Sequence, residues 1–181
     1  MSLFIDKHRL ITDNDWKNST IGQNLLIGSR TFHDFKIYGS TKNTSQEDTD
    51  DNTVVISENT IGNSIQKENL PSGASLSWSI YAKADTNDVV LHTELNGGGG
   101  GTNLTVTQEW KRYSFHGMSN SNGVLFFWKV AGSGSLYLKL PKVEYGLTST
   151  QWSPAPQDFA MKTDLINLQD QINQLKSKLG G

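Results

Sequence analysis

The stretch LYLKLPKVEYGLTSTQWSPAPQDFAMKTDLINLQDQINQLKSKL (residues 136–179) changes character part-way along, and this change decides the fold. Strand-like sequence ends in Trp152 and two prolines, Pro154 and Pro156, and a helical pattern follows at once. Proline cannot donate to a β-ladder and restricts the residue before it, so we expect the strand to end before the prolines. Asp158 is a candidate N-cap, and a helix is predicted from there to the end of the chain.

The predicted helix has apolar residues at alternating steps of four and three. They are Met161, Leu165, Leu168, Ile172, Leu175 and Leu179. This spacing is typical of a coiled-coil seam, which is buried only when another helix faces it. We therefore expect several copies of the domain to be displayed on a shared stalk, which suits weak binding repeated many times. The alternative is a single helix that folds back on its own domain.

Length, composition and charge limit the class of protein. The chain has 181 residues, 35% of them hydrophobic, with a formal net charge of -2 and no cysteine. These values suit one domain with small appendages, and they favour neither nucleic acid nor an anionic membrane as a partner. No apolar run is long enough to span a membrane, and the first ten residues lack the apolar core of a secretory signal. We divide the chain into an N-terminal docking or lead-in segment (residues 1–23), a β-sandwich (24–157) and the helix (158–181).

Short strand-like segments alternate with turn-forming Gly, Pro and Ser residues in the middle region. This spacing predicts an all-β sandwich with strands near residues 53–56, 76–83, 89–96, 104–106, 110–115, 124–130 and 136–143. The polar run at residues 40–52 and the five glycines at 97–101 are predicted to be loops.

Two of these strands carry the candidate binding residues. Alternation along each strand sends the apolar side chains to the core and the others to the outer face. If the two strands pair, the outer side chains form one patch made of Tyr81, Lys83, His92 and Glu94. An aromatic ring can stack on a sugar, and charged groups can bind its hydroxyls, so this patch is a candidate carbohydrate-binding site. The alternative is an ordinary solvated sheet face.

Other aromatic residues are ambiguous or structural. Trp128 is a further binding candidate, but its strand VLFFWKV is apolar on both faces, and a core position is the favoured interpretation. Trp110, Tyr113 and Phe115 are expected in the core, because aromatic residues dominate sandwich interiors. Trp152 is expected to pack across the edge of the sandwich.

Catalytic and metal-binding motifs are not evident. A glycosidase needs two carboxylates across a cleft, and Asp88 and Glu94 have no such partner in the pattern. The histidines show no metal-binding spacing, and the glycine run lacks the Lys-Ser/Thr of a phosphate loop. We therefore predict no enzyme, no metal and no cofactor. Calcium is the less favoured interpretation of the acidic run, whose spacing does not match a calcium loop: Glu47, Asp48, Asp50 and Asp51.

Four segments in order carry a resemblance to a known family. They are NLLIGSRTF (24–32), LPSGASLSWSIYAKAD (70–85), TQEWKRYSF (107–115) and LYLKLPKVEYGLTSTQWSPAPQD (136–158). They resemble the carbohydrate-binding-module-like jelly rolls in tail and baseplate proteins of phages that infect Gram-positive bacteria. The resemblance implies a jelly-roll β-sandwich in the virion, assembled in the cytoplasm of the bacterial host. It also implies non-catalytic binding of host cell-wall or surface polysaccharide, and a role for Glu144 as a hydrogen-bonding anchor at the end of the last strand.

Two functions remain open. The first is a saccharide-binding adhesion module that also contacts other tail or baseplate proteins. The second is a structural connector that docks to such proteins and binds no glycan. A homotrimer is expected in either case, and the number three comes from the resemblance. The a positions (Leu165, Ile172, Leu179) and d positions (Met161, Leu168, Leu175) match neither the usual dimer pattern nor a clean trimer pattern.

Overall fold

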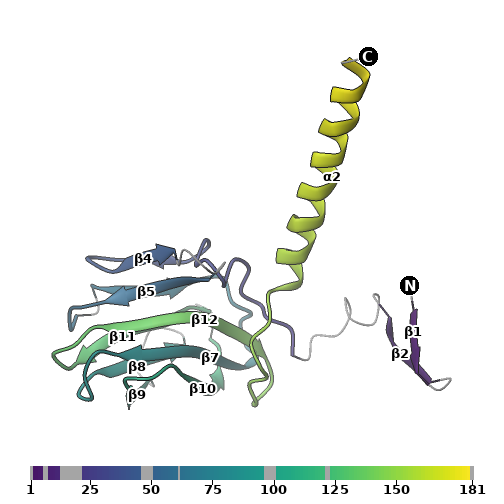
Figure 1. The fold of residues 1–181 in the computed structure, drawn as a ribbon. Helices are drawn as coiled ribbons and strands as arrows, with labels where there is room; N and C mark the ends of the chain where they lie inside the picture. Colours follow the sequence, from purple (N-terminus) through teal and green to yellow (C-terminus); the bar gives the residue numbers. More distant parts are fainter. Residues whose placement is uncertain are drawn as a thin grey trace.

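The protein is built on two five-stranded antiparallel sheets that pack face to face (Figure 1). The computed structural model describes residues 2–5, 8–12, 22–45, 51–60, 62–95, 101–120 and 123–179. Of these, residues 2–5, 8–12, 45, 159–166 and 179 are described by their backbone alone. Sheet I has the order β10 (Lys111–Met118), β7 (Ser75–Ala84), β12 (Leu136–Tyr145), β5 (Asn52–Ile56) and β4 (Lys42–Ser45). Sheet II has the order β3 (Lys36–Ile37), β6 (Ser64–Lys67), β11 (Leu125–Ala131), β8 (Val90–Leu95) and β9 (Thr102–Thr105).

Most of the predicted strands are present, and three segments differ from the prediction. The polar run 40–52 contains β4, which pairs with β5 and closes one edge of sheet I. The short strands β3 and β6 form an edge of sheet II where no strand was predicted. Within residues 1–23, where no pattern was evident, β1 (Ser2–Ile5) and β2 (His8–Thr12) form an antiparallel hairpin. In β4 (KNTS) and β6 (SIQK), the side chains are too polar for alternation to reveal a buried face.

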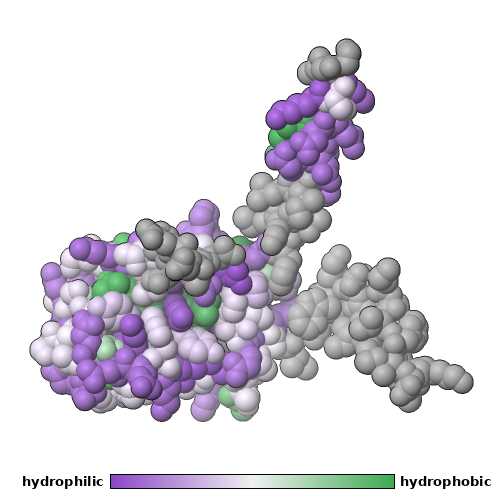
Figure 2. Space-filling view, in the orientation of Figure 1, coloured by the Kyte–Doolittle hydropathy of each residue, from purple (hydrophilic) through white to green (hydrophobic). Residues whose placement is uncertain are grey.

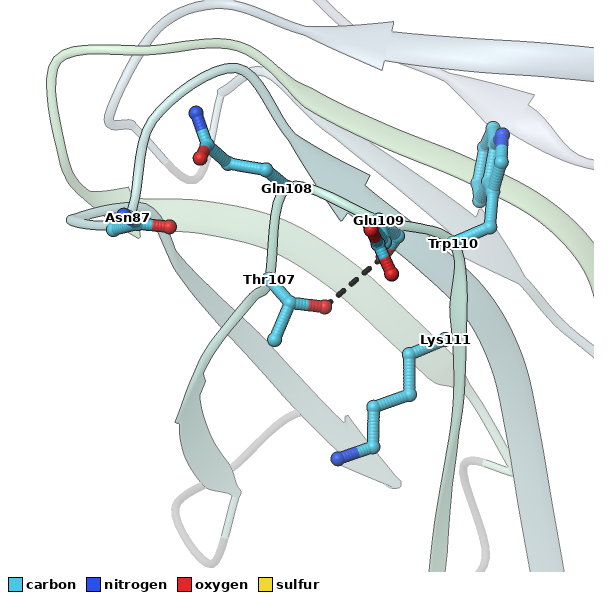
Figure 3. Close-up of a pocket in the computed structure, with 6 residues that line it drawn as sticks. All are labelled: Asn87, Thr107, Gln108, Glu109, Trp110 and Lys111. Atoms are coloured by element: carbon cyan, nitrogen blue, oxygen red, sulfur yellow. Dashed lines mark hydrogen bonds between the residues drawn. The ribbon is translucent and has the colours of Figure 1, made fainter.

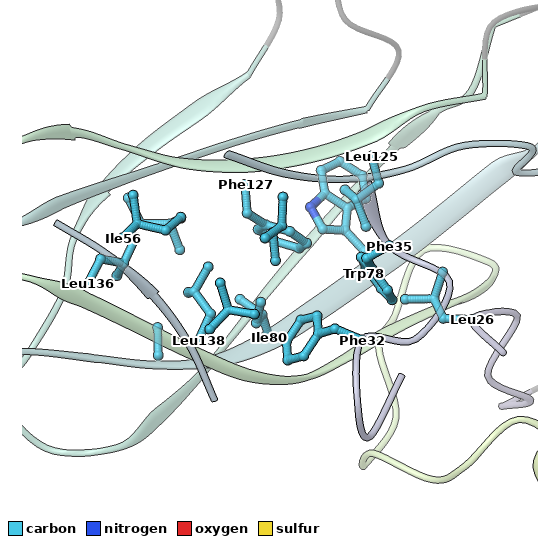
Figure 4. Close-up of a cluster of buried hydrophobic side chains, with 14 of the residues drawn as sticks. Leu26, Phe32, Phe35, Ile56, Trp78, Ile80, Leu125, Phe127, Leu136 and Leu138 are labelled. Atoms are coloured by element: carbon cyan, nitrogen blue, oxygen red, sulfur yellow. The ribbon is translucent and has the colours of Figure 1, made fainter. Parts of the chain in front are cut away.

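The core lies between the two sheets and follows the alternation of each strand (Figure 4). Leu76, Ile80 and Ala82 of β7 are fully buried, as predicted. Trp78 is also buried, and its Nε1 donates a 2.9 Å hydrogen bond across the core to Oγ1 of Thr93 on β8. This bond satisfies two polar groups that burial would otherwise leave unpaired.

The expected core position of the aromatic residues in TQEWKRYSF is confirmed for two of the three. Tyr113 and Phe115 pack against the core, and the ring of Phe115 stacks on that of Trp78 with centroids 5.8 Å apart. Trp110 precedes β10 and lies outside the core cluster.

Strands β7 and β8 do not pair. The predicted patch required this pairing, so its four residues do not form one surface. Strand β7 lies in sheet I and β8 in sheet II, because the connection between these two strands crosses from one sheet to the other. The outer faces of the two sheets point away from each other. Tyr81 and Lys83 therefore lie on one side of the sandwich, and His92 and Glu94 lie on the other.

A closing segment, residues 146–155, folds back against sheet I through two buried charged residues. Lys142 and Glu144 are both fully buried, with Nζ and Oε2 3.4 Å apart. The Lys142 ammonium donates to the carbonyl oxygens of Gly22 (2.8 Å) and Gln151 (2.8 Å) and to Oγ1 of Thr150 (2.6 Å). Burial lowers the pKa of Lys142, and the neighbouring Glu144 carboxylate partly offsets this effect.

Glu144 is the strand-end anchor that the resemblance implied. Its carboxylate accepts hydrogen bonds from the backbone N–H of Thr150 (2.6 Å) and from the hydroxyls of Thr150 (2.8 Å) and Ser149 (3.3 Å). Trp152 was expected to pack across the sandwich edge; its Nε1 donates to the carbonyl oxygen of Pro141 in β12, the middle strand of sheet I, at 3.2 Å.

The start of the helix differs by two residues from the prediction. Helix α2 spans Pro156–Leu179, and Asp158 is its third residue and not its N-cap. One Asp158 carboxylate oxygen accepts from the N–H of Ala155 at 3.1 Å, as an acidic residue does in a capping box, and proline suits the first helical position. The other oxygen accepts from the N–H of Gly28 at 2.8 Å, which ties the base of the helix to the sandwich.

The far half of α2 extends away from the sandwich (Figure 1). Leu168, Ile172 and Leu175 are 54%, 39% and 58% exposed, so three residues of the predicted seam have no cover within the described chain. Figure 2 shows a small apolar area among polar side chains on this part of the helix. The side chains of Met161, Leu165 and Leu179 lie outside the described residues. No described helix is long and apolar enough to cross a membrane.

We predict that Glu144→Ala strongly destabilises the sandwich. The substitution leaves the Lys142 ammonium buried without its counter-charge and removes the acceptor of the Thr150 N–H. The expected loss is about 3–5 kcal/mol in the free energy of unfolding, measured by urea denaturation. The exposed Glu109→Ala is the matched control and should change this free energy by about 0.5 kcal/mol or less. A loss below about 1 kcal/mol for Glu144→Ala would contradict the role given to the pair.

Candidate binding surface

The outer face of sheet I carries two neighbouring rows of side chains that the strand register brings together. Across four strands, Lys83, Tyr137, Val55 and Lys42 form one row. The next row along the strands consists of Arg112, Tyr81 and Lys139. Strands lie about 4.8 Å apart, so a four-strand row extends over about 14 Å. Both rows combine cationic and aromatic residues, and neither contains an acidic residue.

Two lysines of these rows lie over aromatic rings. The Nζ of Lys139 is 4.6 Å from the ring centroid of Trp110, and the Nζ of Lys83 is 5.4 Å from the same centroid. Lys83 also lies 5.2 Å from the ring centroid of Tyr137. We call Tyr81, Lys83, Trp110, Tyr137 and Lys139 the aromatic–lysine surface. All five are partly exposed.

The closing segment covers the other half of this sheet face and leaves the aromatic–lysine surface open. At the boundary, the Tyr81 hydroxyl donates a long hydrogen bond of 3.4 Å to Oε1 of Gln151. Arg112 donates to Oγ of Ser79 at 3.1 Å and to the carbonyl oxygen of Thr150. The guanidinium of Arg112 is therefore engaged with the protein, whereas the lysines beyond it contact aromatic rings.

A hollow of about 450 Å³ adjoins the surface at Trp110 (Figure 3). It is lined by Asn87, Thr107, Gln108, Glu109, Trp110 and Lys111. Figure 3 shows the side chains of Trp110 and Lys111 pointing apart, so the hollow and the open sheet face meet at the indole.

Asp85 is a carboxylate at the edge of the aromatic–lysine surface, where it is hydrogen-bonded to Tyr137. Its Oδ2 accepts from the hydroxyl of Tyr137 at 3.2 Å and from the N–H of Ser135 at 3.3 Å. Partial burial raises the pKa of Tyr137, and the hydrogen bond to Asp85 adds to the effect. The phenol therefore stays neutral as a hydrogen-bonding group.

The outer face of sheet II holds a second group, formed by His92, Glu94, Asn103, Phe126 and Trp128. The rings of His92 and Trp128 have centroids 4.0 Å apart, and Nδ1 of His92 lies 2.5 Å from Oδ1 of Asn103. His92 Nε2 is 3.7 Å from Oε2 of Glu94. Trp128 is only 9% exposed and Glu94 only 8%, so this group is tightly packed and presents little ring surface.

The structure thus divides the five sequence-predicted site residues into two groups. Tyr81 and Lys83 belong to the aromatic–lysine surface, and His92, Glu94 and Trp128 lie together on the opposite side. Trp128 points outward, in register with His92, and not into the core as was favoured. The sequence of this strand did not show which face is buried, because the neighbouring residues Phe126 and Phe127 are both apolar and lie on opposite faces.

Sequence reasoning missed three residues of the open surface. Tyr137 and Lys139 alternate with the core residues Leu136 and Leu138, so the period of β12 contained the signal for their outward position. Trp110 precedes its strand, where alternation gives no information about direction. That β12 lies beside β7 is a property of the topology and not of either strand alone.

Metal-binding geometry is not evident in the described part of the chain, where no three His, Asp or Glu side chains are placed to share an ion. Of the acidic run considered for calcium, Glu47, Asp48 and Asp50 lie outside the described residues. Asp51 lies 3.4 Å from Nε of Arg30 in an ion pair.

Comparison with solved structures identifies the fold as a carbohydrate-binding-module-like jelly roll. One similar structure is the CBM22-1–CBM22-2 tandem of Xyn10C from Paenibacillus barcinonensis (TM-score 0.50, 13% identity, 74% of this chain and 49% of that chain). Another is a family 35 carbohydrate-binding module from Clostridium thermocellum (TM-score 0.48, 14% identity, 61% and 92%). The CBM22-1–GH10 part of xylanase 10B from Clostridium thermocellum also matches (TM-score 0.47, 11% identity, 70% of this chain).

The two antiparallel sheets, the C-terminal helix and the match to the CBM22 tandem confirm the predicted fold class, an all-β jelly-roll sandwich with a C-terminal helix. The chain spans only 29% of the length of the xylanase chain, which includes a further module. No protein-family profile matches the sequence, and no curated protein matches it.

We predict that Gly101→Ala disturbs the His92–Trp128 contact. A Cβ at position 101 would overlap the imidazole of His92 and lie 2.9 Å from Cβ of Glu94. The expected cost is about 1–3 kcal/mol in the free energy of unfolding, with a change in tryptophan fluorescence. Gly62→Ala is the matched control, because a Cβ there meets its nearest atom at 3.5 Å. Equal behaviour of the two variants would show that the ring contact is not held by packing.

Proposed function

We propose that this protein is a non-catalytic saccharide-binding adhesion module of a phage tail or baseplate, and that it binds its ligand at the aromatic–lysine surface. One observation carries the proposal. Three aromatic side chains, Tyr81, Trp110 and Tyr137, gather on a sheet face that the closing segment leaves uncovered. Aromatic rings stack on the C–H faces of sugars, and the adjoining amines and hydroxyls can bind sugar hydroxyls.

The proposal is supported by the ligands of proteins with this fold. The CBM22-1 domain of Xyn10C is described as xylan-binding, and the xylanase module pair was crystallised with xylohexaose. Identities of 11–14% carry the fold and not the ligand, so the surface of this chain must supply the recognition. The phage context comes from the sequence resemblance described above.

We prefer the outer face of sheet I to that of sheet II. Stacking requires an accessible ring, and Trp128 is almost fully covered by its own neighbours. The rings on sheet I are partly exposed and adjoin the hollow beside Trp110. The open face therefore offers both ring surface and space for a ligand.

Trp110→Ala should weaken glycan binding by at least about fivefold, because the stacking of one nucleic-acid base on an aromatic ring is worth about 1–3 kcal/mol and a sugar face makes the same kind of contact. The measurement is titration calorimetry with a glycan identified on an array of Gram-positive cell-wall polysaccharides. The melting temperature should change little, because Trp110 lies outside the core. Gln66→Ala, on the outer face of sheet II, is the control and should bind normally.

Two other results would change the proposed site or the proposed function. Normal binding by Trp110→Ala together with a loss in His92→Ala would place the site on sheet II. Absence of any glycan binding, with binding to a tail or baseplate protein, would favour the structural connector instead.

We further propose that α2 joins several copies of the chain, as a homotrimer, through its exposed seam. Leu168 and Leu175 are more than half exposed on a helix that extends from the sandwich, and a second copy of the same helix offers a matching apolar stripe. A seam of under three heptads is marginal alone, so contacts elsewhere should contribute.

The double variant Leu168→Asn/Leu175→Asn should convert the oligomer to a monomer, because it places amides on the seam. Light scattering coupled to size exclusion measures the mass, and the thermal unfolding of the sandwich should be unchanged. Leu147→Asn is the matched control, since Leu147 is 66% exposed in the closing segment and should leave the oligomer intact. A monomeric native chain at micromolar concentration would refute the stalk.

A further inference from the structure

We infer that the saccharide bound at the aromatic–lysine surface is anionic, carrying phosphate or carboxylate groups that Lys83 and Lys139 bind. This inference rests on the proposed saccharide-binding function and specifies its ligand. It is carried by the unusual position of the two ammonium groups, which lie over one indole ring and are not neutralised by the protein.

The two lysines differ from the ion-paired lysines of the sandwich. Lys36 lies 2.6 Å from Glu68, and Lys67 lies 3.7 Å from Asp34. Within the described residues, by contrast, neither Lys83 nor Lys139 has a carboxylate partner or a hydrogen-bond acceptor, and their contacts are with aromatic rings. Each ammonium group therefore keeps its three N–H donors available to a ligand.

The position of the two groups favours an anion. Both nitrogens lie within 5.4 Å of the Trp110 ring centroid, so they are no farther apart than about one Debye length at moderate salt, roughly 10 Å. Like charges at this separation repel each other, and a bound anion between them removes the repulsion. The rings of Trp110 and Tyr137 hold the amines in place, which reduces the entropy lost when a ligand binds.

Neighbouring groups do not cancel this charge. Asp85 lies at the edge of the surface, where its Oδ2 accepts hydrogen bonds from the hydroxyl of Tyr137 and the N–H of Ser135. Within the described residues it makes no ion pair with Lys83 or Lys139. Glu109 lines the hollow on the other side of Trp110. Lys42 extends the row at the edge of the sheet and is exposed, so the cationic character continues across β12 and β5 to β4.

The ligand should combine both features of the surface. Sugar rings would stack against the aromatic side chains, and a negatively charged substituent on every repeat or every second repeat would meet a lysine. Phosphodiester-linked polymers and polyuronates share this chemistry. A neutral glucan or xylan would fill the aromatic positions and leave the ammonium groups without a partner.

The test compares four polymers by titration calorimetry with the full-length protein: a glycerol-phosphate teichoic acid, polygalacturonate, a neutral xylan and heparin. We expect the teichoic acid, polygalacturonate or both to bind, the neutral xylan to bind at least about tenfold more weakly, and affinity to fall as salt rises from about 0.1 M to about 1 M. The two anionic arms distinguish phosphate from carboxylate as the recognised group.

The variant Lys83→Gln/Lys139→Gln should lose at least about tenfold in affinity for the anionic glycan and most of its salt dependence, since two charge-assisted contacts are removed. The control Lys36→Gln/Lys178→Gln makes the same change in net charge away from this surface and should bind like the native protein. The melting temperature of each variant checks that the sandwich is intact.

Each of the other possible results leads to a different conclusion about the ligand or the function. Tight binding of the neutral xylan that depends on Trp110 would overturn the anionic assignment while retaining the proposed function. Binding of all polyanions, heparin included, with no effect of Trp110→Ala would show ion exchange only and overturn the inference. Equal losses in both double variants would also overturn it, because overall charge and not this surface would then control binding. No binding to any glycan would remove the proposed function itself.

Discussion

The buried pair of Lys142 and Glu144 is the interaction on which the arrangement of this protein depends. Two charges without solvent exposure are tolerated because hydrogen bonds from the closing segment, and from Gly22 in the case of Lys142, satisfy them. Asn24 completes the same junction, since its Oδ1 accepts from the N–H groups of Leu26 (3.0 Å) and Val143 (3.2 Å). The entry of the chain into the sandwich and its exit are therefore held at one place.

This junction has two consequences for function. It covers one half of the outer face of sheet I with residues 146–155, so that the open half becomes a bounded surface. It also fixes the base of α2, through the bonds from Asp158 to Ala155 and Gly28. The candidate binding face and a helix that could join copies are thus placed on the same rigid support.

Charged lysines occupy three different environments in this sandwich. Lys142 is buried and paired, and Lys129 is buried at the sandwich end, where its ammonium donates to the carbonyl oxygens of Ser57 (2.7 Å) and Gly134 (2.5 Å). Burial lowers the pKa of both. Lys83 and Lys139 are partly exposed and contact only rings. Lys142 and Lys129 hold loops in place through their hydrogen bonds. Lys83 and Lys139 make no such bonds, and this difference is the reason for proposing that they bind a ligand.

The sequence by itself determined the class of the fold and the direction of most side chains. Alternation in β7 placed Trp78 inside and Tyr81 and Lys83 outside, because a strand has a period of two whatever its neighbours. The prolines and the heptad spacing likewise located the helix to within two residues. Only the tertiary structure decided which outer side chains share a face. The crossing of β7 and β8 into different sheets separated Lys83 from His92, and the pairing of β7 with β12 brought Lys83 beside Tyr137. Strand order depends on long-range contacts across the core, and no local period carries that information.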